Sequence, residues 1–179
     1  EVIYAAKTIK LSKTSMTYNG KKQKPSVTIT DAAGKRLKNG TDYKVTYPKK
    51  TQNVGKYTVT VTLKGNYTGT VKKTFTILPK NTAISKLTAS KNTVTVKWKK
   101  QTKQTAGYEI QYSTSSKFTK KTTKTVKAAK NSMTSKKITK LKAKKKYYVR
   151  VRTYKKVKIN GKSTKIYSGW SKVKTVVTK

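Results

Sequence analysis

The chain has 179 residues, of which 46 are lysine or arginine and four are aspartate or glutamate, giving a formal net charge of +42. It contains no histidine and no cysteine, which excludes an imidazole base, a thiol nucleophile, a disulfide and a zinc site with nitrogen or sulfur ligands. Four carboxylates, one of them Glu1 at the terminus, leave little material for a paired acid–base site or a calcium site. The composition therefore predicts a chain that is not an enzyme and that carries no cofactor.

Hydrophobic residues make up 33% of the chain, and a low hydrophobic content with a high net charge is typical of disordered proteins. The order of the residues argues against disorder, because aromatic and β-branched residues alternate with lysine and threonine in short runs. No run of 18 apolar residues is present, so we expect no membrane span. The chain begins at Glu1 without an initiator methionine or an apolar signal segment, which favours a mature or excised portion of a longer protein.

Short alternating runs mark the strands expected in the first half. Apolar side chains at every second position predict strands with one buried face, while threonine and lysine take the wet face. The apolar positions are Val27, Ile29, Tyr43, Val45, Tyr47, Tyr57, Val59, Val61, Leu63, Phe75 and Ile77. Asn-Gly pairs at 19–20, 39–40 and 160–161 predict tight hairpins. Asp31 and Asp42 lie beside turns, where aspartate commonly accepts backbone hydrogen bonds.

The alternation stops at residues 78–82, where the sequence Leu-Pro-Lys-Asn-Thr predicts a linker. It resumes in the second half at Val94, Val96, Trp98, Tyr108, Ile110, Tyr112, Tyr147, Val149 and Val151, followed by a last strand over residues 170–177. Residues 1–80 carry 17 cations and three acids, whereas residues 81–179 carry 29 cations and one acid. The simplest organisation is an all-β fold of two β-sandwich domains, residues 1–80 and 81–179.

The second half resembles a fibronectin type III domain. The residues that carry the resemblance follow the order of that family: Trp98, residues 107–112, Leu141, Tyr147 and residues 168–171. Leu141, followed six residues later by Tyr147, resembles the family's tyrosine corner, in which the tyrosine hydroxyl bonds to the backbone and the ring fills the core. The chain departs from the family at Ala143-Lys144, where Pro-Gly is usual. The resemblance implies core positions for Trp98, Leu141 and Tyr147.

The first half, over residues 7–79, resembles the bacterial Ig-like repeats of large Gram-positive surface proteins. The segments that carry the resemblance are residues 18–21, 40–43, 53–61, 64–69 and 75–77. The two resemblances imply a stalk, spacer or adhesion module of a bacterial cell-surface or secreted protein, whose partners include neighbouring domains of a longer chain. An accessory region of a surface enzyme, with its chemistry in another domain, is an alternative.

Arg150 and Arg152 alternate with core residues and therefore share the outer face of one expected strand. If Trp170 lies alongside, its ring sits between the two guanidinium groups, as in the Trp-Ser ladder of cytokine-receptor fibronectin domains, which Trp170-Ser171 resembles. Arginine stacks on aromatic rings better than lysine does, which favours a structural cation–π ladder; a ligand-binding surface is the alternative. Glu109 faces outward on the neighbouring strand, and we expect it to form a cross-strand ion pair with Arg150 or Arg152.

The segment from Lys117 to Lys146 contains 13 lysines and no acid. A solvated face is the simplest interpretation. The alternative is a surface that binds anionic cell-wall polymers, such as teichoic acids, or sulfated or acidic host glycans. Nucleic acid is disfavoured, because arginine is nearly absent and exposed aromatic residues do not alternate with the lysines. The candidate anion-binding residues are Lys117, Lys120, Lys121, Lys124, Lys136, Lys137, Lys144, Lys145 and Lys146.

Overall fold

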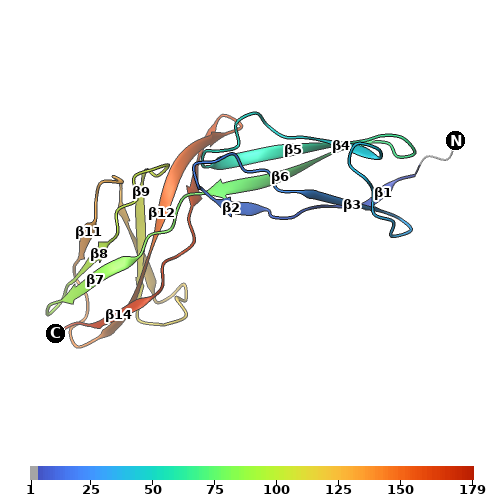
Figure 1. The fold of residues 1–179 in the computed structure, drawn as a ribbon. Helices are drawn as coiled ribbons and strands as arrows, with labels where there is room; N and C mark the ends of the chain where they lie inside the picture. The colour runs from blue at the N-terminus through green and yellow to red at the C-terminus, as the bar shows by residue number, and fades with distance from the viewer. Residues whose placement is uncertain (1–3) are drawn as a thin grey trace. The chain divides into compact units, whose positions relative to one another are not determined.

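The computed structural model describes residues 4–179 (Figure 1), and these residues form 14 strands and no helix. The predicted all-β fold class is thus confirmed. The chain divides into two compact units, Glu1–Leu78 and Pro79–Lys179. Since the described part of the chain has no helix, it has none that is long and apolar enough to cross a membrane.

The first unit is built from two sheets. Its strands are β1 (Ala6–Leu11), β2 (Ser15–Thr17), β3 (Val27–Asp31), β4 (Tyr43–Thr46), β5 (Gly55–Leu63) and β6 (Thr70–Leu78). β1 pairs with β3, and the second sheet has the order β2-β6-β5-β4, with β2 parallel to β6. The alternating apolar residues point inward, so that Ile29, Val59, Val61, Phe75 and Ile77 are almost completely buried.

The second unit is a sandwich of a three-stranded and a five-stranded sheet. Its strands are β7 (Ile84–Ala89), β8 (Val94–Trp98), β9 (Gly107–Ser113), β10 (Thr123–Ala128), β11 (Ser135–Ile138), β12 (Lys146–Ile159), β13 (Lys162–Tyr167) and β14 (Lys174–Val177). One sheet has the order β11-β8-β7, and the other has the order β10-β9-β12-β13, with β14 also paired to β12. β12 therefore pairs with β9 and also with both C-terminal strands, β13 and β14.

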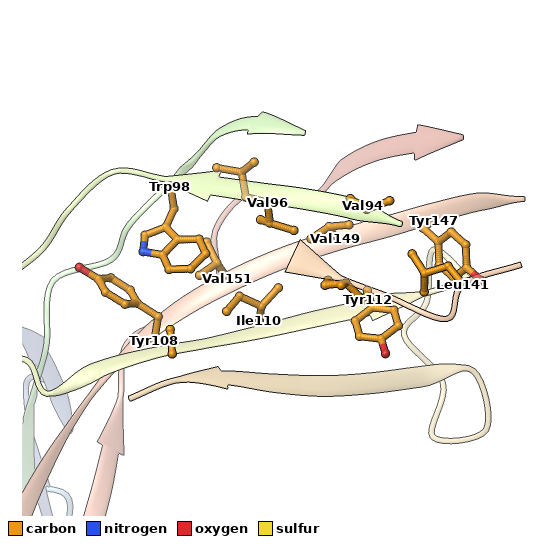
Figure 2. Packing of buried hydrophobic residues seen from close by; sticks show 13 residues of the cluster. Val94, Val96, Trp98, Tyr108, Ile110, Tyr112, Leu141, Tyr147, Val149 and Val151 are labelled. Carbon is orange, nitrogen blue, oxygen red and sulfur yellow. The ribbon is translucent and has the colours of Figure 1, made fainter. Parts of the chain in front are cut away.

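The core of the second unit lies between these sheets (Figure 2). Trp98 and Tyr108 pack at one end, with ring centroids 5.1 Å apart, and the indole nitrogen of Trp98 donates to the Met133 carbonyl at 3.0 Å. Leu141 and Tyr147 lie at the other end, where the Tyr147 hydroxyl accepts a hydrogen bond from the Lys142 backbone N–H at 3.1 Å. The tyrosine therefore makes the backbone contact that the resemblance implies.

In the loop before β12, the chain has Ala143-Lys144 where Pro-Gly is usual in a tyrosine corner. Lys144 stands at the glycine position and has a φ of 52°, and Lys140 has a φ of 59°. Both lysines are thus in the left-handed region, which costs a residue with a side chain about 1 kcal/mol. The loop keeps the fold at the cost of local backbone strain.

The three Asn-Gly pairs have different outcomes. Asn160 and Gly161 join β12 to β13 in a two-residue turn with φ values of 50° and 78°, as predicted. The hairpins predicted at residues 19–20 and 39–40 are wrong, because β2, β3 and β4 pair with β6, β1 and β5 rather than with one another. Asn-Gly favours a local turn, but the partner of each strand is set by packing that is distant in the sequence.

Candidate functional site

The outer face of β12 carries the two arginines singled out in the sequence. Arg150 and Arg152 alternate with the buried residues Val149 and Val151, so the pleat of the strand directs both guanidinium groups away from the core. In the antiparallel register with β9, Arg150 lies opposite Gln111 and Arg152 lies opposite Glu109. Each arginine thus faces a polar partner on the adjacent strand.

Five side chains form an alternating column on this face, which we call the arginine stack. The ring of Trp170 lies between the two arginines, with its centroid 4.5 Å from the guanidinium carbon of Arg150 and 4.2 Å from that of Arg152. Phe118 covers the other side of Arg150 at 4.0 Å, and Tyr167 covers the other side of Arg152 at 3.7 Å. Four contacts at about 0.5–1 kcal/mol each give the stack about 2–4 kcal/mol if they add.

Two serines fix the segment that carries the aromatic rings. The Ser168 hydroxyl accepts from the Thr153 N–H at 2.9 Å, and the Ser171 hydroxyl accepts from the Val151 N–H at 3.0 Å. The backbone N–H groups of the same serines donate to the carbonyls of Thr153 and Val151. This segment advances by three residues, from Ser168 to Ser171, while β12 advances by only two, from Thr153 to Val151. The mismatch interrupts the pairing with β12 in the stretch that separates β13 from β14. The last strand predicted over residues 170–177 is therefore present but shorter: β14 covers Lys174–Val177, and Trp170 lies in the interruption before it.

Glu109 forms its ion pair with Arg152. The Arg152 Nη2 and Nε atoms donate to Glu109 Oε1 at 2.6 and 3.2 Å. The expected alternative partner, Arg150, instead donates twice to Gln111 Oε1, at 2.7 and 2.9 Å, because Gln111 is the residue opposite it. The Glu109 side chain is only 7% exposed although it points outward. It lies between Arg152 on β12 and Lys127, its cross-strand partner on β10.

The stack is partly desolvated, and its titratable groups reflect this. The pKa of Arg150 is lowered, first by burial and then by the nearby charge of Arg152. The pKa of Tyr167 is raised, first by burial and then by the charge of Glu109. Burial thus disfavours the charged form of both groups, and aromatic faces surround the arginine charges.

Two members of the arginine stack, Tyr167 and Phe118, could not be predicted from the alternation of residues in the strands. Tyr167-Ser168 repeats Trp170-Ser171 three residues earlier, and this repeat is the signal that points to Tyr167. Phe118 lies in the loop between β9 and β10 with a φ of 49°, and no periodicity in the sequence connects it with Arg150. Its place in the stack depends on the path of that loop.

The nine candidate lysines do not gather at one place. Lys121, Lys124 and Lys145 line a cavity of 570 Å³, whose lining also contains two lysines outside the candidate set, Lys140 and Lys142. The other candidates lie outside this lining: Lys117, Lys120, Lys136, Lys137, Lys144 and Lys146. We call the cavity the lysine pocket. Among residues 4–179, no three histidine, cysteine, aspartate or glutamate side chains form a group that could hold a metal ion.

Two family models match successive parts of the chain. The family model of the fibronectin type III domain matches residues 78–168, and that of the MBG domain matches residues 7–81. The chain is similar to a computationally redesigned β-sandwich protein, with 19% identity, a TM-score of 0.43, and coverage of 55% of this chain and 89% of that one. It is also similar to the chicken CNTN1 FN1–FN3 domains, with 15% identity, a TM-score of 0.42, and coverage of 99% of this chain and 65% of that one.

A search of curated proteins finds no match. The first unit is similar to MBG domains, and the more specific Gram-positive repeat type stays a prediction. Both matched families are typically non-catalytic modules. The fibronectin type III model matches more than half of the chain, and the chain therefore belongs to the fibronectin type III domain family.

Proposed function

We propose that the chain is a non-catalytic module of a bacterial cell-surface or secreted protein, where it serves as a stalk, spacer or adhesion unit between neighbouring domains. The observation that carries this proposal is that every aspartate and glutamate side chain among residues 4–179 has a structural partner. Asp31 accepts from the N–H groups of Ala33 and Lys35 at 3.0 and 2.9 Å, Asp42 accepts from the Lys38 N–H at 2.8 Å, and Glu109 is held by Arg152. These carboxylates therefore hold turns and neighbouring strands together, which suits a structural module.

The connection between the units supports a spacer role. β6 ends at Leu78, whose carbonyl accepts from the Tyr18 N–H within the first unit at 2.8 Å. The Lys80 carbonyl accepts from the Thr153 hydroxyl within the second unit at 2.7 Å. Only Pro79 separates these two anchored residues, and proline has a fixed φ. The connecting segment is therefore short, which suits modules that follow one another in series along a longer chain.

The proposal is tested on the cells that make the protein. A protease added to intact cells should remove residues 4–179, while cytosolic proteins survive. In a second test, these residues are replaced in the parent protein by two unrelated β-sandwich domains whose combined length is the same. This replacement should preserve any enzymatic activity of the parent protein. Protection of the chain until the cells are lysed would contradict the surface location. Loss of catalysis on replacement, with the rest of the parent still folded, would contradict the non-catalytic role.

A further inference from the structure

The lysine pocket lies between two loops of the second unit. One side comes from β9, β10 and the loop that joins them, with Tyr112 and Lys121 among its residues, and the other comes from the loop between β11 and β12 and the start of β12. The complete lining is Tyr112, Thr114, Lys121, Thr122, Lys124, Thr139, Lys140, Leu141, Lys142, Lys145 and Tyr147. Its volume of 570 Å³ is within the range of about 300–1,000 Å³ that is usual for ligand pockets.

The charge of this pocket is not balanced by the protein. Five of its lining residues are lysines, all five are exposed, and no carboxylate lines the cavity. Glu109 is the only acid of the second unit, and it is held by Arg152 in the arginine stack. A concave surface of one charge concentrates the field and attracts ions of the opposite charge. The pocket is therefore suited to an anionic ligand.

Hydrogen bonds hold the backbone of one wall in place. The Leu141 N–H donates to the Asn92 carbonyl at 3.0 Å, and the Asn92 side chain donates back to the Leu141 carbonyl at 2.7 Å. The Lys145 N–H donates to the Thr178 hydroxyl at 2.9 Å. Together with the tyrosine corner, these contacts fix the loop that bears three of the five lysines, so a ligand does not have to order its backbone.

The opposite wall is fixed in a similar way. The Thr122 N–H donates to the Thr119 carbonyl at 3.1 Å, and the Thr122 hydroxyl lies 2.8 Å from that of Ser113. These contacts anchor the loop between Lys121 and Lys124, whose ammonium groups remain exposed. Both walls thus present exposed cationic ends on a preorganised backbone.

We propose that the lysine pocket binds the phosphate or sulfate groups of an anionic polymer with a sugar or polyol backbone. Lysine provides compact point charges that suit such groups, and several lysines around one cavity favour a ligand with repeated charges. Thr114 and Thr139 supply hydroxyls that can bond to the hydroxyls of the polymer backbone. Nucleic acid fits less well, because Tyr112 and Tyr147 are only 9% and 7% exposed and offer no free face for a base.

This inference deepens the adhesion role and rests on the proposed function for the pocket's access to extracellular polymers. The test uses the purified chain and two variants that each lose three charges. The pocket variant is K121Q/K140Q/K142Q. The control variant is K136Q/K137Q/K144Q, whose lysines lie in the same part of the chain but outside the cavity. The probes are a poly(glycerol phosphate) oligomer and a heparin oligosaccharide, with single-stranded DNA as a third probe, each titrated at rising salt.

The pocket variant should bind at least one of the two polymers about tenfold more weakly than the natural chain, since it loses three of the five lysine charges and each exposed charge pair contributes only modestly. The control variant should lose less than about threefold, and both variants should keep the thermal unfolding profile of the natural chain. A preference for one polymer distinguishes a phosphate source from a sulfate source. Equal losses in the two variants, or no binding of either polymer, would overturn the proposal. Tighter binding of DNA that is lost in the pocket variant would overturn the sugar or polyol assignment. Because the assay contains no cells, its failure would leave the surface location and the non-catalytic role untouched.

Discussion

Replacement of Arg152 by lysine should destabilise the second unit although the charge is kept. Arg152 lies between the rings of Trp170 and Tyr167, at 4.2 and 3.7 Å, and donates two hydrogen bonds to Glu109. Lysine has no planar group that can stack on two rings and bond to a carboxylate at the same time. The substitution therefore separates the geometry of the guanidinium group from its charge.

The size of the effect follows from these contacts. Loss of two cation–π contacts costs about 1–2 kcal/mol. Loss of one charge-assisted hydrogen bond adds about 1 kcal/mol, a reduced value because the Arg152 side chain is 23% exposed. The expected total is about 2–3 kcal/mol, which lowers the Tm of a domain of this size by about 10 °C or more.

Tryptophan fluorescence during urea unfolding measures this effect in one unit, because both tryptophans, Trp98 and Trp170, lie in the second unit. The matched control is R36K, followed by circular dichroism, since Arg36 is exposed in the first unit and has no aromatic ring or carboxylate partner among the described residues. R36K should change the free energy of unfolding by less than about 0.5 kcal/mol. If R152K costs no more than R36K, the arginine stack does not stabilise the fold and the reasoning is refuted.

Three further substitutions have defined outcomes. K144G should raise the free energy of unfolding of the second unit by up to about 1 kcal/mol, seen as a higher urea midpoint, because glycine adopts the left-handed φ of Lys144 without strain. G107A should lower that midpoint strongly, because the added Cβ would lie 2.3 Å from the Ala128 carbonyl oxygen; an unchanged midpoint would contradict the close packing of β9 and β10. The pKa of Asp31 is lowered, chiefly by the hydrogen bond from the Lys35 N–H, so its contribution to the stability of the first unit is present above about pH 4 and is lost as the pH falls through the folded pKa. D31N should remove this pH-dependent contribution to the stability, as followed by circular dichroism during an acid titration. A titration curve that D31N leaves unchanged would contradict the contribution of Asp31.

Local periodicity accounts for most of what could be predicted from the sequence. Alternation places Val149 and Val151 in the core and Arg150 and Arg152 on the outer face, because the side chains of a strand point to opposite sides in turn. The same rule places Glu109 outward but does not show that the arginine stack covers it. Its burial depends on a neighbouring strand and on a segment near the end of the chain.

Contacts between distant segments account for the rest. Phe118 reaches Arg150 from a loop, and Lys121 shares the lysine pocket with Lys140 from another loop. Neither approach has a signature in the order of the residues, because the first depends on the path of the loop between β9 and β10, and the second depends also on the path of the loop between β11 and β12. The 13 lysines between Lys117 and Lys146 show that positive charge is abundant in this segment, but the fold decides which of these charges converge.

The arginine stack and the lysine pocket also differ in how their charge is compensated. In the stack, three aromatic rings, Gln111 and Glu109 surround the two guanidinium groups, so the protein supplies its own partners for both cations. In the pocket, five ammonium groups stand on a fixed backbone with no carboxylate in the lining. Like charges held near one another repel, and this repulsion is relieved when an anion binds among them. A stack that is already compensated gains little from a ligand, whereas the uncompensated pocket does gain, which makes the pocket rather than the arginines the place where an external anion should bind.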